Sequence, residues 1–245
     1  MTPTPTTLDP AEIAKFAAMA DAWWDPKGDF APLHRMNPAR LGFLRTTILA
    51  HFARPDAGLR PLSGLTLIDV GCGGGLVTEP MARLGATVTG LDGAPESVAA
   101  ASAHAAAVGL AIDYRQGTAE DLARTDARFD VVLALEIVEH VADLHAFCDA
   151  AQALVARGGL MIVSTINRTL KARALAITAA ERLLRWIPEG THDYEKLVTP
   201  EELRGALHGL DVSGPFGLSF NPLTGQWTLG DDASMNYFMA GAKRA

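Results

Sequence analysis

A short apolar segment that runs directly into a glycine-rich turn is the feature that most restricts how this chain can fold. Residues 67–70 combine β-branched and other apolar side chains, as buried strands do, and Asp69 lies just before the turn. Four of the next five positions, 71–75, are glycine. Glycine tolerates positive φ and lets a ligand approach the main chain without meeting a β-carbon. Since residues 76–84 have a helical pattern, the segment predicts a strand, turn and helix that form a nucleotide-type pocket.

After this segment, predicted strands and helices alternate along the chain. The strands are Thr66–Val70, Thr87–Leu91, Ile112–Arg115, Phe129–Leu135 and Leu160–Thr165, and helices are expected at Pro95–Val108 and about 143–155. Such alternation is typical of an α/β fold with a doubly wound, mostly parallel sheet. Thr199-Pro200-Glu201-Glu202 has the pattern of a capping box and predicts a helix to about His208. Two later apolar segments, 217–220 and 237–242, predict an antiparallel hairpin at the sheet edge, with a turn-rich stretch between them.

The first sixty residues read as a helical extension. Residues 1–7 are expected to be disordered, and Asp9-Pro10-Ala11-Glu12 then starts a helix that carries Ile13, Phe16 and Trp23/Trp24 as an apolar stripe. Asn37-Pro38 predicts the start of a second helix. This extension, residues 1–60, is expected to be either a brace or a lid for a main domain at 61–245, with an insert at 167–198.

Charge and cysteine content restrict the partners. The formal net charge of −7 argues against nucleic acid as a partner. The two cysteines, Cys72 and Cys148, lack the spacing of a disulfide framework or a zinc site, which favours a reducing cytoplasm. No apolar run approaches the length of a membrane-spanning helix, about 20 residues.

The insert is the one strongly basic stretch of this acidic chain. Between residues 168 and 185 there are five basic residues and a single acidic one, Glu181; the basic residues are Arg168, Lys171, Arg173, Arg182 and Arg185. On a helical wheel Lys171, Arg182 and Arg185 share one side, opposite a mostly apolar face. Such a helix can lie on anionic lipid, or it can pack on the domain and expose an ordinary charged face.

Acidic residues at the ends of the first two strands indicate which cofactor the pocket takes. Asp69 can receive an ammonium group, whereas it would repel a pyrophosphate. Asp92, at the tip of the second strand, can accept two ribose hydroxyls or, alternatively, cap the next helix. Residues 117–122 follow the third strand and could contact an adenine edge. Together these features favour a class I S-adenosylmethionine-dependent methyltransferase over a dehydrogenase.

The fourth strand leads into Glu136, Glu139 and His140. If this segment is helical, the three side chains fall at i, i+3 and i+4 on one face and could hold a magnesium ion. Alternatively, His140 is a general base for a phenolic proton, or the three residues only order the loop.

These motifs closely resemble those of the ubiquinone-biosynthesis O-methyltransferases. The matching segments are Phe16 with Trp23-Trp24-Asp25, residues 32–42, 69–75, 88–92, 136–140, 164–168 and 190–193, and Asn221-Pro222. The resemblance covers most of the chain from about Glu12 to Gly241. The Leu33-His34-Arg35 and Gly190-Thr191-His192-Asp193 pieces are far more specific than the glycine loop.

The resemblance implies roles for individual residues. Cofactor contacts fall on Arg40, Gly71, Asp92 and Leu135, with Arg40 holding the methionine carboxylate. It implies that the N-terminal helices form a lid, that Glu136, Glu139 and His140 form a magnesium site, and that the basic insert contacts the inner face of the cytoplasmic membrane. The implied partners are a polyprenylated phenol or quinol, anionic lipid and a ubiquinone-biosynthesis complex.

The expected reaction is in-line transfer of the sulfonium methyl group to a catechol oxygen, as on 2-polyprenyl-6-hydroxyphenol and 3-demethylubiquinol. Two alternatives stay open: a class I methyltransferase for another small phenolic or carboxylic metabolite, and a lipid-surface scaffold that binds the cofactor without using it. The sequence leaves open whether one or both methylations belong to this chain, the isoprenoid length and the oligomeric state.

Overall fold

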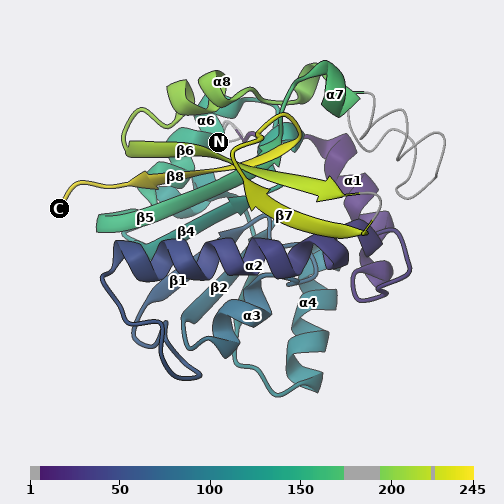
Figure 1. The fold of residues 1–245 in the computed structure, drawn as a ribbon. Helices are drawn as coiled ribbons and strands as arrows, with labels where there is room; N and C mark the ends of the chain where they lie inside the picture. The colour runs from purple at the N-terminus through teal and green to yellow at the C-terminus, as the bar shows by residue number, and fades with distance from the viewer. Residues whose placement is uncertain (1–5, 174–193, 222–223) are drawn as a thin grey trace.

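A single eight-stranded sheet forms the centre of the protein in the computed structural model, which describes residues 6–173, 194–221 and 224–245 (Figure 1). The strands are β1 Thr66–Val70, β2 Thr87–Asp92, β3 Asp113–Gln116, β4 Phe129–Leu135, β5 Val155–Ile166, β6 Asp211–Asn221, β7 Gln226–Gly230 and β8 Asn236–Ala242. Their order across the sheet is β3-β2-β1-β4-β5-β8-β6-β7. The first five are parallel, whereas β8 is antiparallel to both β5 and β6, and β7 is antiparallel to β6.

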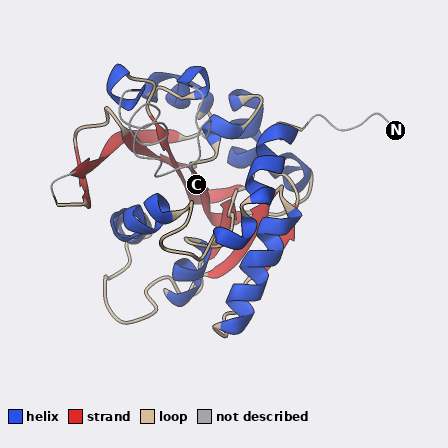
Figure 2. Cartoon of the chain, turned by 90° about the vertical axis from the view of Figure 1, so that its right-hand side faces the viewer, coloured by secondary structure: helices blue, strands red, loops and turns tan. Residues whose placement is uncertain are grey.

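Helices cover both faces of this sheet (Figure 2). The described α-helices are α1 Pro10–Ala18, α2 Ala31–His51, α3 Thr78–Arg83, α4 Pro95–Ala107, α5 Ala119–Ala123, α6 Leu144–Ala153, α7 Leu170–Ala172 and α8 Pro200–Ala206, and the 3-10 turns are η1 Ala20–Ala22, η2 Val138–His140 and η4 Tyr194–Lys196. None of the helices within the described ranges has the length and apolar character needed to cross a bilayer.

Alternation along the strands divides the core into two layers. On one face Leu67 and Leu133 pack with Leu44 and Ile48 of α2, which crosses the sheet in Figure 1. On the other face Ile68 and its neighbours pack with α6 and α8. Because successive strand side chains point to opposite faces, one short strand supplies both cores. The predicted doubly wound α/β fold is therefore confirmed, with α2 as part of its core.

The second helix begins earlier than the sequence predicted. It starts at Ala31, with Pro32 in its first turn, and Pro38 lies inside it. Asn37 does not cap a helix, because its side-chain amide donates to the carbonyl oxygen of Leu76 at 2.8 Å and its Oδ1 accepts from Arg40. The predicted start at Asn37 is wrong, since the residue that resembles a cap instead ties α2 to the glycine-rich turn.

The antiparallel addition after β5 is confirmed but is larger than predicted. Residues 211–221 and 236–242 pair as β6 and β8, and β8 lies between β5 and β6. The turn-rich stretch between them contains a further strand, β7, which forms the outer edge of the sheet. The capping box of α8 is present as predicted, with Thr199 and Glu202 each bonding the other's main chain.

The N-terminal segment is tied to the strand ends. Thr7 is buried, and Leu8 forms a bridge with Val141 while the Ala142 amide donates to the Thr7 carbonyl oxygen at 2.8 Å. The expected disorder of residues 1–7 is therefore wrong for Thr7, and residues 1–5 lie outside the described residues. These contacts join segments more than 130 positions apart, so no local sequence pattern predicts them.

Candidate active site

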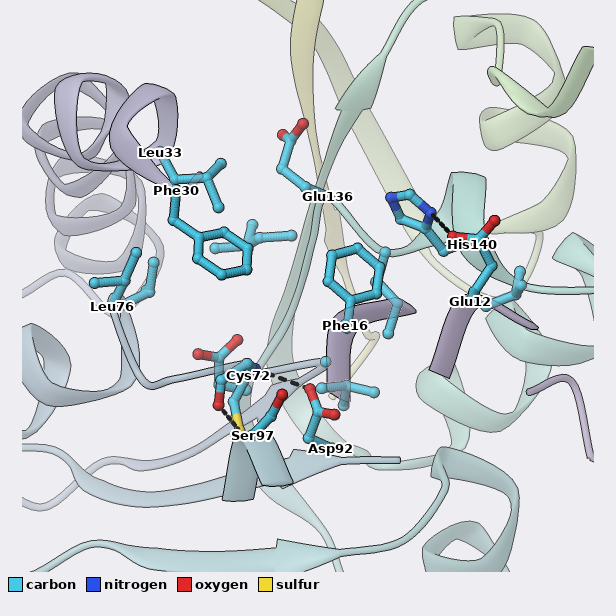
Figure 3. Close-up of a pocket in the computed structure, with 18 of the residues that line it drawn as sticks. Glu12, Phe16, Phe30, Leu33, Cys72, Leu76, Asp92, Ser97, Glu136 and His140 are labelled. Atoms are coloured by element: carbon cyan, nitrogen blue, oxygen red, sulfur yellow. Dashed lines mark hydrogen bonds and ion pairs between the residues drawn. The ribbon is translucent and has the colours of Figure 1, made fainter. Parts of the chain in front are cut away.

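A cavity of about 440 Å³ opens at the carboxyl ends of the parallel strands, beneath the N-terminal segment. One end is lined by Asp69, the glycine-rich turn, Asp92 and residues 117–120, and the other by Ile166, Phe220, Trp227 and Met235. Figure 3 shows the Glu136, His140, Phe16 and Phe30 side chains around the cavity. The five predicted cofactor or base residues, Gly71 of the turn with Arg40, Asp92, Leu135 and His140, therefore line one cavity.

Asp69 lies buried at the end of β1, where it accepts a hydrogen bond from the Thr78 hydroxyl at 2.7 Å. Burial raises the pKa of Asp69 to about 6, against the opposing effects of the Thr78 hydrogen bond and the Arg40 charge. The carboxylate is thus mostly ionised at neutral pH, and further donors or cations beside it would favour that form. A ligand ammonium group would supply such help, which fits the role predicted for Asp69.

Asp92 lines the cavity at the end of β2 and orders the backbone on either side of it. Its oxygens accept from the Gly73 amide at 2.9 Å and from the Ala94 amide, at the start of α4, at 2.8 Å. Burial also raises its pKa. Each carboxylate oxygen has a second lone pair, so the same group that orders the turn can accept ribose hydroxyls.

Trp23 covers the glycine-rich turn. A β-carbon on Gly73, whose φ is +51°, would lie 2.4 Å from two carbons of the Trp23 ring. Trp23 also stacks on Phe30 with ring centroids 3.7 Å apart, and the neighbouring Trp24 donates to the Gly74 carbonyl oxygen at 2.9 Å. The predicted apolar stripe does pack on the domain, but the helix predicted to carry it ends at Ala18, and Trp23 follows the 3-10 turn η1. The sequence did not indicate that Trp23 lies on the glycine-rich turn.

Arg40 reaches the same end of the cavity from α2. It is buried, and its Nε and Nη2 donate to Asn37 Oδ1 at 3.2 and 2.9 Å. Burial lowers its pKa, while the carboxylates of Glu136 and Asp69 oppose that shift. A buried guanidinium flanked by two acids provides a cation for a carboxylate that enters beside Asp69.

The predicted grouping of Glu136, Glu139 and His140 is not what the structure shows. Glu136 has a φ of +53°, and only a 3-10 turn follows it, so the α-helical spacing that would align the three side chains is absent. Glu136 accepts from Ser164 at 2.7 Å and from Asn236 at 3.2 Å, and Glu139 accepts from Thr165 at 2.9 Å. His140 Nδ1 pairs instead with Glu12 at 2.9 Å.

This donor set does not fit a magnesium ion. Burial, and then the neighbouring Glu136 charge, raise the pKa of Glu139 above its usual range, and each of the three side chains has hydrogen-bond partners of its own. Across the described ranges, no three acidic, histidine or cysteine side chains are arranged to hold a metal. We assign no step of the reaction to a metal.

The turn at 117–122 is shared with the N-terminal segment. Thr118 caps α5 by accepting from the Asp121 amide at 3.0 Å. Glu120 accepts from the amide and hydroxyl of Thr7 at 2.9 and 2.5 Å. The turn predicted to contact an adenine edge therefore lies against Thr7, a contact that the sequence did not indicate.

Only the flanks of the basic insert are described. Lys171 pairs with Asp232 at 2.7 Å, and the Arg173 guanidinium lies 5.2 Å from the centre of the Tyr194 ring. Arg168 pairs with Glu202. The predicted amphipathic face with Arg182 and Arg185, and the Gly190–Asp193 motif, lie outside the described residues.

Comparisons with known proteins agree with this geometry. The family model described as "Methyltransferase domain" matches residues 68–163. The chain is 52% identical to the ubiquinone biosynthesis O-methyltransferase of Azorhizobium caulinodans, over 96% of this chain and 94% of that protein. It is 53% identical to the protein of the same name from Caulobacter sp. (strain K31), over 97% of this chain and 95% of that protein.

Solved structures share the fold at low identity. Magnesium protoporphyrin IX methyltransferase from Synechocystis, solved with bound S-adenosylhomocysteine, has a TM-score of 0.63 at 18% identity and covers 94% of both chains. A SAM-dependent methyltransferase from Thermotoga maritima has a TM-score of 0.65 at 16% identity, over 96% of this chain and 99% of that one. Both support the class I methyltransferase architecture of the sheet and its antiparallel addition.

Proposed function

The chain belongs to the ubiquinone biosynthesis O-methyltransferases, and we propose that its cavity methylates one hydroxyl of a polyprenylated catechol with S-adenosylmethionine as the methyl donor. The expected substrates are 2-polyprenyl-6-hydroxyphenol and 3-demethylubiquinol. One observation carries the proposal: a single cavity joins strand-end acids, a buried arginine, an imidazole and an aromatic end. These are the groups that a charged methyl donor and a phenol with a long apolar tail require.

The donor fits the end of the cavity formed by β1, β2 and α2. Asp69 would accept its ammonium group, Arg40 its carboxylate and Asp92 its ribose hydroxyls. Gly71, with a φ of +75°, and Leu135 line the same end of the cavity, and their main chain would lie close to the bound donor. The bound donor supplies an electrophilic methyl group on a sulfonium that is already a good leaving group. The protein therefore has to align the methyl group with a phenol oxygen and remove the phenolic proton.

His140 is the group that we propose for that proton. It lines the cavity from the turn after β4. The unperturbed pKa values are about 6.5 for imidazole and about 10 for a phenol, so transfer becomes favourable as the oxygen bonds to carbon and loses its basicity. The proton moves from the oxygen to His140 while the oxygen–methyl bond forms and the sulfur–methyl bond breaks.

The opposite end of the cavity suits an isoprenoid tail. Ile166, Phe220, Trp227 and Met235 supply apolar lining there, and the Phe220 and Trp227 rings lie 5.3 Å apart. We further propose that the protein works in the cytoplasm at the inner face of the membrane, within a ubiquinone-biosynthesis complex, and that the basic insert at 167–198 provides the lipid contact. A substrate with a long tail resides in the bilayer, so peripheral contact would deliver it.

Complementation tests the function directly. A strain that lacks ubiquinone O-methylation should regain ubiquinone when it expresses this chain, and mass analysis should show that both catechol intermediates disappear. Loss of only one intermediate would assign a single methylation to the chain. Persistence of both, with the protein expressed and binding S-adenosylmethionine, would contradict the proposal and favour a different methyl acceptor.

A further inference from the structure

We propose that Glu12 is a positioning residue for the reaction, and that it fixes the His140 imidazole in the tautomer and orientation that accept the phenolic proton. The inference rests on the proposed function, because it concerns how that proton is removed. It adds a requirement that the residues after β4 alone do not show. The His140 imidazole is oriented as a base only when helix α1 is docked on the cavity.

The geometry of the pair is that of an oriented histidine. Glu12 Oε2 lies 2.9 Å from His140 Nδ1, and Figure 3 shows the other ring nitrogen on the side away from Glu12. An ionised carboxylate can only accept, so Nδ1 must carry the proton that it donates. The lone pair that takes a further proton is then on Nε2. Phe16 supports the ring from one side, edge to face at 5.1 Å and 87°.

The carboxylate is itself held in place. Lys196 Nζ lies 3.6 Å from Glu12 Oε1 and Lys15 Nζ lies 3.7 Å from Oε2. Lys196 also pairs at 3.0 Å with Asp9, the residue that caps α1. Both members of the pair are mostly sheltered from solvent, with side-chain exposures of 17% for Glu12 and 12% for His140. A hydrogen bond sheltered in this way keeps more of its strength than one in water.

The pair connects residues 128 positions apart and ties the N-terminal segment to the turn after β4. The Leu8–Val141 bridge and the bonds between Thr7 and Glu120 lie beside it. When the phenol oxygen forms its bond to the methyl group, its proton moves to Nε2, and the imidazolium that results is stabilised by the Glu12 carboxylate. No other reactant is needed, and the proton leaves to solvent after the products depart.

Two soluble catechols of different acidity separate positioning from docking. Unsubstituted catechol keeps its proton at the assay pH, whereas a nitrocatechol is largely ionised there and needs no base. With catechol, Glu12→Met should lower kcat by about tenfold, and His140→Gln by about a hundredfold, with the KM for S-adenosylmethionine unchanged. With nitrocatechol both losses should shrink to within about twofold of the native enzyme. Glu12→Gln, which keeps an acceptor oxygen, should recover part of the catechol activity.

Thr7→Val is the matched control, since it removes a hydroxyl contact that ties the N-terminal segment to Glu120 and leaves the Glu12–His140 pair and its two lysines in place. Its effect should be equal on the two catechols. Equal losses on both substrates for Glu12→Met, or no loss on either, would overturn the positioning role while leaving the proposed function intact. Failure of the native enzyme to methylate either catechol, or the polyprenylated substrate, would instead contradict the proposed function itself.

Discussion

The Trp23 ring occupies the space directly above Gly73, where a β-carbon would come within 2.4 Å of two ring carbons. The glycine at this position therefore serves two purposes. It admits the positive φ of the turn, and it lets a side chain from the N-terminal segment lie on the turn. Closure over the cofactor end and the shape of the turn are thus coupled through one residue pair.

Gly73→Ala should lower the free energy of unfolding by about 2 to 3 kcal/mol, from backbone strain and from the clash with Trp23. Gly109→Ala is the matched control: its φ is +70°, but nothing lies within 4 Å of its β-carbon position. It should cost only about 1 kcal/mol, the conformational part. Urea unfolding of both variants makes the comparison, and equal losses would show that Trp23 does not rest on Gly73.

Affinity for S-adenosylmethionine should fall as the pH drops through about 6. Burial raises the pKa of Asp69 to about 6, so the carboxylate that pairs with the ligand ammonium is ionised above this pH and protonated below it. Below pH 6 binding must expel a proton, and the dissociation constant should rise about tenfold per pH unit. Calorimetry in two buffers would detect the proton release. Asp69→Asn should bind weakly at every pH, and a native enzyme with pH-independent affinity between 4.5 and 7 would contradict this role.

Local chemistry explains which parts of this site the sequence predicts. Asp69 and Asp92 follow apolar strands, and parallel strands present their carboxyl ends at one edge, so their shared cavity can be predicted. The Glu136 turn could not be predicted, because a positive φ at a non-glycine residue is decided by tertiary contacts with Ser164 and Asn236.

The N-terminal contacts illustrate the same limit. The sequence predicts that Glu12 lies in the first turn of a helix, and the structure confirms this. Its partner His140, however, lies in a turn far along the chain. Trp23 likewise reads as part of an apolar stripe. Pairing over such separations depends on how the whole chain folds, and a single sequence carries no signal for it.

Trp227→Ala should impair long-tailed substrates selectively. Trp227 lines the apolar end of the cavity beside Phe220, so its loss removes apolar contact area from an isoprenoid chain and leaves the catechol end intact. We expect the KM for a polyprenylated catechol to rise about tenfold, because part of the isoprenoid chain loses its apolar contact with the protein. The KM for unsubstituted catechol should stay unchanged. Steady-state assays in detergent micelles with both substrates provide the measurement. A similar change for both substrates would place the tail elsewhere.

Arg182→Ser/Arg185→Ser should weaken binding to anionic vesicles. Each basic residue near an anionic membrane contributes about 1 kcal/mol, so the double variant should bind about thirtyfold less tightly. Cosedimentation with vesicles containing phosphatidylglycerol measures this, with neutral vesicles as the lipid control. Lys27→Ser/Arg60→Ser removes the same charge from two exposed positions outside the insert. If that control loses as much affinity, net charge rather than the insert governs binding.

Methylation of a soluble catechol should survive exhaustive chelation of divalent cations. Burial raises the pKa of Glu139, Thr165 donates to it, and His140 Nδ1 is directed to Glu12. A metal would have to deprotonate Glu139 and separate these pairs before binding. Glu139→Gln, which copies the neutral form, should therefore keep most of its kcat at pH 7. Activity that disappears with chelator, returns with magnesium and is abolished by Glu139→Gln would show that the three residues rearrange around a metal during turnover.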